Sequence, residues 1–421
     1  MKAALRLVAA GTLFSFATAL TAADLPMADP AEVGMSAESL ARVDALLEEK
    51  ITDGEFPGAV ILVARNGKIA HLSALGKRTP DGEEMTTDSI FRIYSMTKPV
   101  TSVLALMMVE EGKLDLAAPL AKYLPEFAEM TIATVGADGS TQTEPANKQI
   151  TILDLMRHTA GLTYGFFGTG PARMALKDEN PGNGEKANRE VAMVLGGLPL
   201  EHQPGSAWEY SRATDVLGAV IEVVEGAKLS EVMKARVFDP LGMTRTGFTI
   251  DNPADQALIA EPYDDDRMIG NIAVFDPRKT RPFETGGGGL VSTAGDYAKF
   301  LEMLMNGGSL DGTRILSPAT VKYMLTDQLG DIAKGKFDIP GKDYGFGLGV
   351  AVRRDAGGGA LNGNPGDFFW GGAAGTYMMG DPTEDMSVIW MMQAPKKSIG
   401  IRGLLRNMIY GSITESHTPS R

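Results

Sequence analysis

The spacing of apolar and polar residues predicts a helix and a β-hairpin near the start of the chain. In residues 36–54 the apolar side chains recur every three or four positions, which predicts an amphipathic helix with Ser36 as its N-cap. Residues 58–78 hold two β-rich runs joined by Asn66 and Gly67, a dipeptide that accepts the positive φ angles of a two-residue turn. A hairpin should therefore follow the helix directly.

Further along, helical patterns separated by loops rich in Gly and Pro are followed by strand patterns. Residues 163–188, rich in Gly and Asn, are expected to form a long irregular loop. The run Gly286–Gly289 is expected to be flexible and to lead into a helix from about Thr293. Strand patterns return near the C-terminal end, in residues 344–354, 367–382 and 385–394.

Strands at both ends with helices between them predict an α/β fold, with one antiparallel sheet built from both ends and a helical domain inserted between them. We place the α/β domain in residues 24–92 plus 284–421 and the helical domain in residues 93–283.

The first 23 residues differ from the rest of the chain. Lys2 and Arg6 precede an apolar run, and small residues near Ala22 and Ala23 offer a cleavage point, which predicts a secretory signal peptide in residues 1–23. The apolar stretch is short for a membrane anchor, the alternative interpretation. We therefore expect an exported protein, periplasmic or secreted, with no stable membrane association after cleavage.

Composition excludes several classes of function. The chain has no cysteine, so thiol catalysis and cysteine-ligated metals are excluded. Its formal net charge is −13, and an acidic surface repels phosphate backbones and anionic lipids. Nucleic-acid partners are therefore not expected.

The stretch "RIYSMTKPVTSVLALMMVEEGKLDL" supplies a candidate nucleophile. Ser95 and Lys98 are three residues apart and share one face of a helix whose first turn is marked by Pro99. Free N–H groups at a helix start favour negative charge, and partial burial should lower the pKa of Lys98 toward neutrality, so that it acts as a base. The alternative is a capping serine beside a surface lysine, because this spacing also arises by chance.

A resemblance to a known family rests on the stretch around Ser95, "ITILDLMRHTAGL", "GGGGLVSTAGDYAKFL" and the closing strands. Through these segments the chain resembles the serine β-lactamase and penicillin-binding-protein superfamily, most closely the class C β-lactamase-like carboxylesterases called family VIII. The resemblance implies the β-lactamase/transpeptidase-like fold, an antiparallel sheet flanked by helices with an inserted all-helical domain, and an active site at the interface of the two domains. It also implies a serine hydrolase that acts on short-chain esters through an acyl-enzyme and needs no metal or organic cofactor.

The family's second motif begins with tyrosine, and "WEYSRATDVLG" supplies Tyr210. By resemblance Tyr210 faces Ser95 and Lys98 and carries the proton to the leaving alcohol. Arg212 stands where the β-lactamase form has asparagine, which weakens the case for recognition of a lactam amide.

The third motif, with Lys or His at its head in lactamases, corresponds to Trp370, Gly371 and Gly372 in "FFWGGAAGTYMMGDP". Trp370 carries no charge, so an anionic substrate loses its expected anchor and an uncharged ester is favoured. By resemblance these three residues bind substrate, and the backbone N–H groups of Ser95 and Ala373 form the oxyanion hole.

Other chemistries find little support. There is no G-x-S-x-G elbow and no H-E-x-x-H, and His158 is expected to support a loop. Asp264–Asp266 are expected to be solvated, and Gly286–Gly289 lack the lysine of a phosphate loop. A class C-type β-lactamase, a D-amino-acid amidase or peptidase, and a β-lactam-sensing or acyl-binding protein stay open as alternatives.

Overall fold

The computed structural model describes residues 24–166, 168–269, 272–335, 339–355, 357, 359–397 and 400–417. The predicted signal peptide, residues 1–23, lies outside the described residues. Within the described part, no helix combines the length and apolar character needed to cross a membrane.

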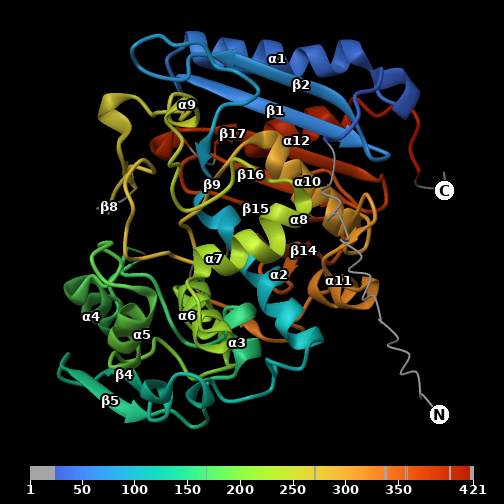
Figure 1. Ribbon diagram of the computed structural model, residues 1–421. Coiled ribbons are helices and arrows are strands. Elements are labelled where there is room, and N and C mark those ends of the chain that lie inside the picture. The colour runs from blue at the N-terminus through green and yellow to red at the C-terminus, as the bar shows by residue number, and fades with distance from the viewer. Residues whose placement is uncertain are drawn as a thin grey trace, which may run out of the picture.

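A seven-stranded antiparallel sheet carries the fold, in the order β13-β14-β15-β16-β17-β1-β2 (Figure 1). In this sheet β1 (Gly58–Arg65) pairs with β17 (Met386–Met392), so that the two ends of the chain share one sheet, as predicted. The other strands are β2 (Lys68–Gly76), β13 (Tyr344–Phe346), β14 (Ala351–Arg353), β15 (Phe368–Gly371) and β16 (Tyr377–Asp381).

The predicted hairpin and first helix are both present. Asn66 and Gly67 join β1 to β2 with φ angles of 54° and 68°, the left-handed values of a two-residue turn. The helix α1 (Ala37–Thr52) begins at Ser36, whose hydroxyl accepts the backbone N–H of Ser39.

Helices cover both faces of the sheet. On one face α1 packs against β2 and against α12 (Arg402–Tyr410). On the other face lies α10 (Ala294–Met305), which contacts β1, β16 and β17 (Figure 1). It begins at Thr293, as predicted, because the Thr293 hydroxyl caps it by accepting the N–H of Asp296.

The middle of the chain is mainly helical and not wholly so. It contains α2 (Thr97–Glu110), α3 (Ile152–Met156), α4 (Pro171–Glu179), α5 (Asn188–Gly196), α6 (Ala213–Glu225), α7 (Leu229–Met233), α8 (Asp239–Leu241) and α9 (Pro253–Gln256). Short strand pairs accompany them: β4 (Thr131–Val135) with β5 (Thr141–Pro145), and β7 (Met268–Ile269) with β8 (Ile272–Ala273). The expected all-helical character of this region is therefore corrected, and the domain boundaries stay a prediction.

Short elements complete the chain. They are β3 (Phe91–Arg92), β6 (Ala207–Trp208), β9 (Val291–Ser292), β10 (Ser309–Leu310), β11 (Thr313–Arg314), β12 (Ala333–Lys334) and α11 (Pro318–Met324).

Two loop expectations were wrong. Residues 163–188 are interrupted by α4, because Pro171 sits in the first turn of a segment with helical apolar spacing and Asn180 closes it in a left-handed conformation. The run Gly286–Gly289 is packed rather than flexible: a Cβ on Gly286 would lie 2.7 Å from the carbonyl oxygen of Thr214. Close approach to α6 explains why glycine stands there.

Candidate active site

Ser95 lies in a single 3-10 turn, Tyr94–Met96, that leads directly into α2. The helix α2 is apolar and buried on nearly all sides, and it runs through the middle of the molecule (Figure 1). Pro99 occupies its first turn, as predicted. A fully packed helix thus holds the serine at a fixed position.

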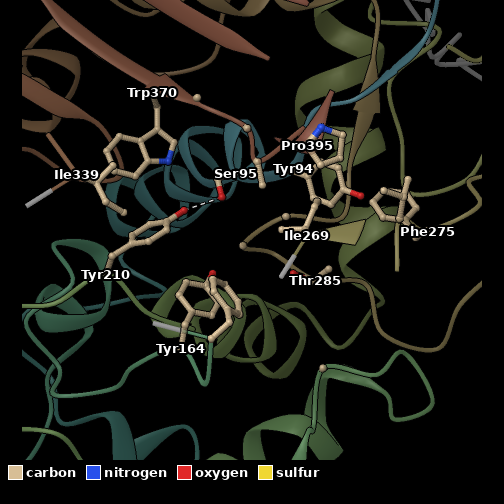
Figure 2. A pocket seen from close by; sticks show the side chains of 18 of the residues that line it. Tyr94, Ser95, Tyr164, Tyr210, Ile269, Phe275, Thr285, Ile339, Trp370 and Pro395 are labelled. Carbon is tan, nitrogen blue, oxygen red and sulfur yellow. Dashed lines mark hydrogen bonds between the residues drawn. The ribbon is translucent and has the colours of Figure 1, made fainter. Parts of the chain in front are cut away.

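The Ser95 hydroxyl meets both other predicted catalytic side chains. Lys98 Nζ lies 3.2 Å from Ser95 Oγ, and the Tyr210 hydroxyl lies 2.6 Å from the same oxygen (Figure 2). No side-chain hydrogen bond caps the start of α2, so Ser95 does not serve as a capping residue. Lys98 is 0% exposed, so it is not a surface lysine either.

The pKa of Lys98 is raised in the structure, and not lowered as predicted from the sequence. Burial lowers this pKa, but the phenolic oxygens of Tyr164 and Tyr210 and the carboxylate of Asp215 outweigh it, so the pKa of Lys98 is raised. The Nζ atom donates to three oxygens, on Ser95, Tyr164 and Gly287, the last at 2.7 Å. Three acceptors match the three N–H bonds of an ammonium ion, so Lys98 is a cation at neutral pH.

The residue before the nucleophile has an unusual backbone. Tyr94 has a φ angle of 42°, a left-handed value that bulky side chains rarely adopt. Its ring packs edge-on against Phe275 with centroids 5.4 Å apart. This packing offsets the strain, and the turn presents Ser95 to the cavity.

Tyr210 is held on a loop between β6 and α6 by an aromatic cluster. Its ring lies 5.0 Å from that of His158 and 5.3 Å from that of Trp370, centroid to centroid. His158 is buried, its Nδ1 lies 3.1 Å from the hydroxyl of Ser211, and burial with the nearby Lys98 charge keeps its pKa well below the ordinary value. His158 therefore supports the tyrosine loop, as expected.

Tyr164 was missed by the reasoning from sequence. Its hydroxyl lies 3.2 Å from Lys98 Nζ, and its ring lies 5.3 Å from that of Tyr210. Burial raises the pKa of Tyr164, so its hydroxyl is neutral at physiological pH. The one available signal was its place just after "ITILDLMRHTAGL", a segment of the family resemblance.

The run Gly286–Gly289 supplies the third oxygen that accepts a hydrogen bond from Lys98 Nζ. The backbone N–H of Gly287 donates to the carboxylate of Asp215 at 2.9 Å, and the Gly286 carbonyl accepts the hydroxyl of Thr101 at 2.7 Å. These bonds tie the run to α6 and α2, and the Gly287 carbonyl is thereby aimed at Lys98.

The third-motif residues lie beside the nucleophile. The end of β15 packs against the turn that carries Ser95, and the Thr376 hydroxyl donates to the Ile93 carbonyl at 3.1 Å. Trp370, Gly371, Gly372 and Ala373 all line the cavity around Ser95. The Trp370 ring is almost fully buried and faces Tyr210 (Figure 2).

A cation does approach this motif, from another element. Arg402 at the start of α12 donates to the carbonyl oxygens of Gly372 and Thr376, at 2.9 and 3.1 Å. Burial lowers its pKa to about 10, so it is still charged at neutral pH. The third motif thus lacks a positive charge at Trp370 itself, but Arg402 supplies one beside it.

The cavity has a volume of about 1210 Å³ and opens over Ser95, with aromatic and apolar walls interrupted by charged groups. Arg212, which replaces the asparagine, reaches this cavity, pairs with Asp215 at 3.1 Å and lies over the Tyr164 ring at 5.5 Å. The charge of Arg212 is thus bound by groups of the protein itself.

No grouping of three or more potential metal ligands occurs among the described residues. In the acidic run Asp264–Asp266, Asp264 and Asp265 are exposed, as expected, and pair with Arg267 and the Lys396 ammonium. Asp266 is buried rather than solvated, because its carboxylate accepts the backbone N–H of Lys396.

The family model described as Beta-lactamase matches residues 43–402. The chain belongs to the beta-lactamase family. The fold class predicted from the sequence is thereby confirmed.

Relatives of this beta-lactamase family member include named esterases. Esterase EstB of Burkholderia gladioli is 34% identical over 395 residues, covering 88% of this chain and 94% of EstB. Uncharacterized protein MT1414 of Mycobacterium tuberculosis (strain CDC 1551 / Oshkosh) is 37% identical over 363 residues, covering 83% and 88%. The solved structure of "EstCE1, a hydrolase with promiscuous acyltransferase activity" superposes with a TM-score of 0.74 at 29% identity, covering 89% of this chain and 99% of EstCE1.

Proposed function

We propose that the protein is a serine carboxylesterase that hydrolyses short-chain esters in two steps through an acyl-enzyme on Ser95. The observation that carries this proposal is the convergence of Lys98 and Tyr210 on Ser95 Oγ, at 3.2 and 2.6 Å, at the floor of a large cavity. The similarity to EstB and EstCE1, named as an esterase and a hydrolase, supports the reaction class.

In the first step Ser95 Oγ attacks the ester carbonyl, and its proton passes to Tyr210, which enters this step as the phenolate and leaves it as the neutral phenol. The raised pKa of Lys98 makes it a fixed cation that stabilises negative charge on the serine and tyrosine oxygens, rather than the base that takes the proton. Tyr210 then gives the proton to the leaving alcohol, and water releases the acid by the same route in reverse.

The oxyanion is proposed to lie between the backbone N–H groups of Ser95 and Ala373. Both residues line the cavity, and the two segments touch through Gly372 and Ile93. Gly371 and Gly372 leave the strand edge open to the substrate, and Trp370 forms the wall beside Tyr210.

Esters are proposed over β-lactams because Trp370 replaces the third-motif cation and Arg212 replaces the asparagine. A class C-type β-lactamase or a D-amino-acid amidase is the second candidate, favoured by Arg402, which places a charge beside Gly372. A sensor that acylates once is the alternative outside catalysis.

Export to the periplasm or the medium is proposed from the pattern of residues 1–23 alone. Detection of the mature N-terminus near residue 24 in a secreted or periplasmic fraction would test it, and a full-length protein retained in the cytoplasm would refute it.

The experiment for the reaction compares p-nitrophenyl butyrate with the cephalosporin nitrocefin on one preparation. We expect a much higher kcat/KM for the ester. An equal or higher kcat/KM for nitrocefin would overturn the ester assignment. A single stoichiometric burst followed by no turnover would identify a sensor.

A further inference from the structure

One basic side chain in the cavity, that of Arg281, has neither a carboxylate nor a carbonyl oxygen bound to it among the described residues. Arg281 lines the cavity, and its guanidinium lies over the Phe275 ring at 3.9 Å. Among the described residues it forms no ion pair, and its buried Nε has no hydrogen-bond partner. Burial lowers the pKa of Arg281, and the nearby charge of Arg92 adds to this effect, while the hydroxyl of Tyr94 opposes it.

Its neighbours differ from it in this respect. Arg92 and Arg278 both bind the carboxylate of Glu261, and Lys396 binds that of Asp265 at 3.1 Å. Farther along the cavity Arg406 binds Asp367. A partly buried guanidinium without an acceptor is costly unless something else binds it, and here its open side is the cavity.

The charge of the whole cavity points the same way. Its described lining includes six basic residues, Arg212, Lys279, Arg281, Lys396, Arg402 and Arg406, and two acidic ones, Asp215 and Asp276. The chain as a whole carries −13. Four of the six are paired with carboxylates, and Arg402 is bound to two carbonyl oxygens. Among the described lining residues, Arg281 is therefore the cation left to attract an anion into the cavity.

The position of Arg281 indicates which part of a substrate it meets. Tyr94 and Phe275 lie on one side of Ser95, and Tyr210 and Trp370 lie on the other (Figure 2). Tyr210 must reach the leaving oxygen to protonate it, so the alcohol belongs on the Tyr210 side. The acyl chain then extends toward Phe275, against which Arg281 is stacked.

We propose that Arg281 binds a carboxylate at the far end of the acyl chain, so that half-esters of dicarboxylic acids are preferred substrates. This rests on the proposed function, since the half-ester is cleaved by Ser95. The planar guanidinium, held by the Phe275 ring, suits two parallel hydrogen bonds to a carboxylate.

The test compares two acyl chains of nearly equal shape, monoethyl glutarate and the ethyl ester of glutaramic acid, in which a neutral amide replaces the carboxylate. A pH-stat follows acid release at constant ionic strength. We expect wild-type kcat/KM to favour the carboxylate by about 10- to 100-fold, the range for a charge-assisted hydrogen bond. Arg281→Gln should bring the ratio close to one, and Arg281→Lys should give an intermediate ratio.

Lys279→Gln is the matched control, because it removes the same charge from a cavity-lining residue two positions away. It should keep the wild-type ratio. A ratio that is unchanged in Arg281→Gln, or that falls equally in Lys279→Gln, overturns the proposal. Because each ratio comes from one preparation, partial misfolding cancels.

The two proposals can fail separately. If the wild-type protein hydrolyses ethyl butyrate and shows no preference for the carboxylate, the anion site is wrong and the esterase stands. If no ester is turned over, the proposed function itself fails.

Discussion

Replacing Gly372 by alanine should damage the oxyanion hole while leaving the nucleophile in place. A Cβ on Gly372 would lie well under 3.0 Å from both the carbonyl oxygen of Ile93 and the hydroxyl of Thr376. The Ile93 contact is backbone and cannot rotate away, so the strand end must move by roughly 1 Å to restore an ordinary contact. Ala373, the next residue, moves with it.

The size of the effect follows from that displacement. Loss of one oxyanion donor lowers kcat by about 10²- to 10³-fold, and a 1 Å misplacement alone can cost about 10²-fold. We therefore expect kcat for p-nitrophenyl butyrate to fall by about two to three orders of magnitude in Gly372→Ala, a rise of roughly 3 to 4 kcal/mol in the barrier.

The assay pairs steady-state hydrolysis with titration of Ser95 by a fluorophosphonate, which counts folded sites. Gly295→Ala is the matched control, because a Cβ at Gly295 meets nothing within 4 Å. Wild-type kcat in Gly372→Ala, with every site titrated, would refute the assignment of the oxyanion hole to this strand end.

Two further predictions concern the catalytic unit and stability. Ser95→Ala and Lys98→Ala should each lower kcat/KM by more than about 10³-fold. The double variant should lose no more than the worse single variant, because the two residues act together. Additive losses would show instead that they act independently. Burial raises the pKa of Glu302 to about 7, so its stabilising contribution is complete below the ordinary pKa near 4.5 and is lost as pH rises through 7. From pH 5 to 8 the free energy of unfolding of the wild type should therefore fall by about 2 to 3 kcal/mol relative to Glu302→Gln, as measured in urea; a constant difference would contradict this.

Elements with strong local patterns were predictable from the sequence. The hairpin at Asn66 and Gly67 depends on two residues that tolerate positive φ. The helices α1 and α10 each begin after a residue with a capping hydroxyl, Ser36 and Thr293. The β-lactamase fold was recognised because several short motifs occur in the order typical of the family.

Features made by distant segments were not predictable. Tyr164 joins Lys98 across 66 positions, and Arg402 reaches Gly372 across 30. The pKa of Lys98 was given the wrong direction because the prediction counted burial and could not count the oxygens of Tyr164 and Tyr210. The helix α4 was missed because Gly and Asn dominate the composition around it.

The most direct test of the account is to label the purified protein with a fluorophosphonate probe, digest it and map the labelled peptide by mass spectrometry. The account predicts one label per chain, on Ser95, and none in Ser95→Ala. A label on any other serine would contradict it.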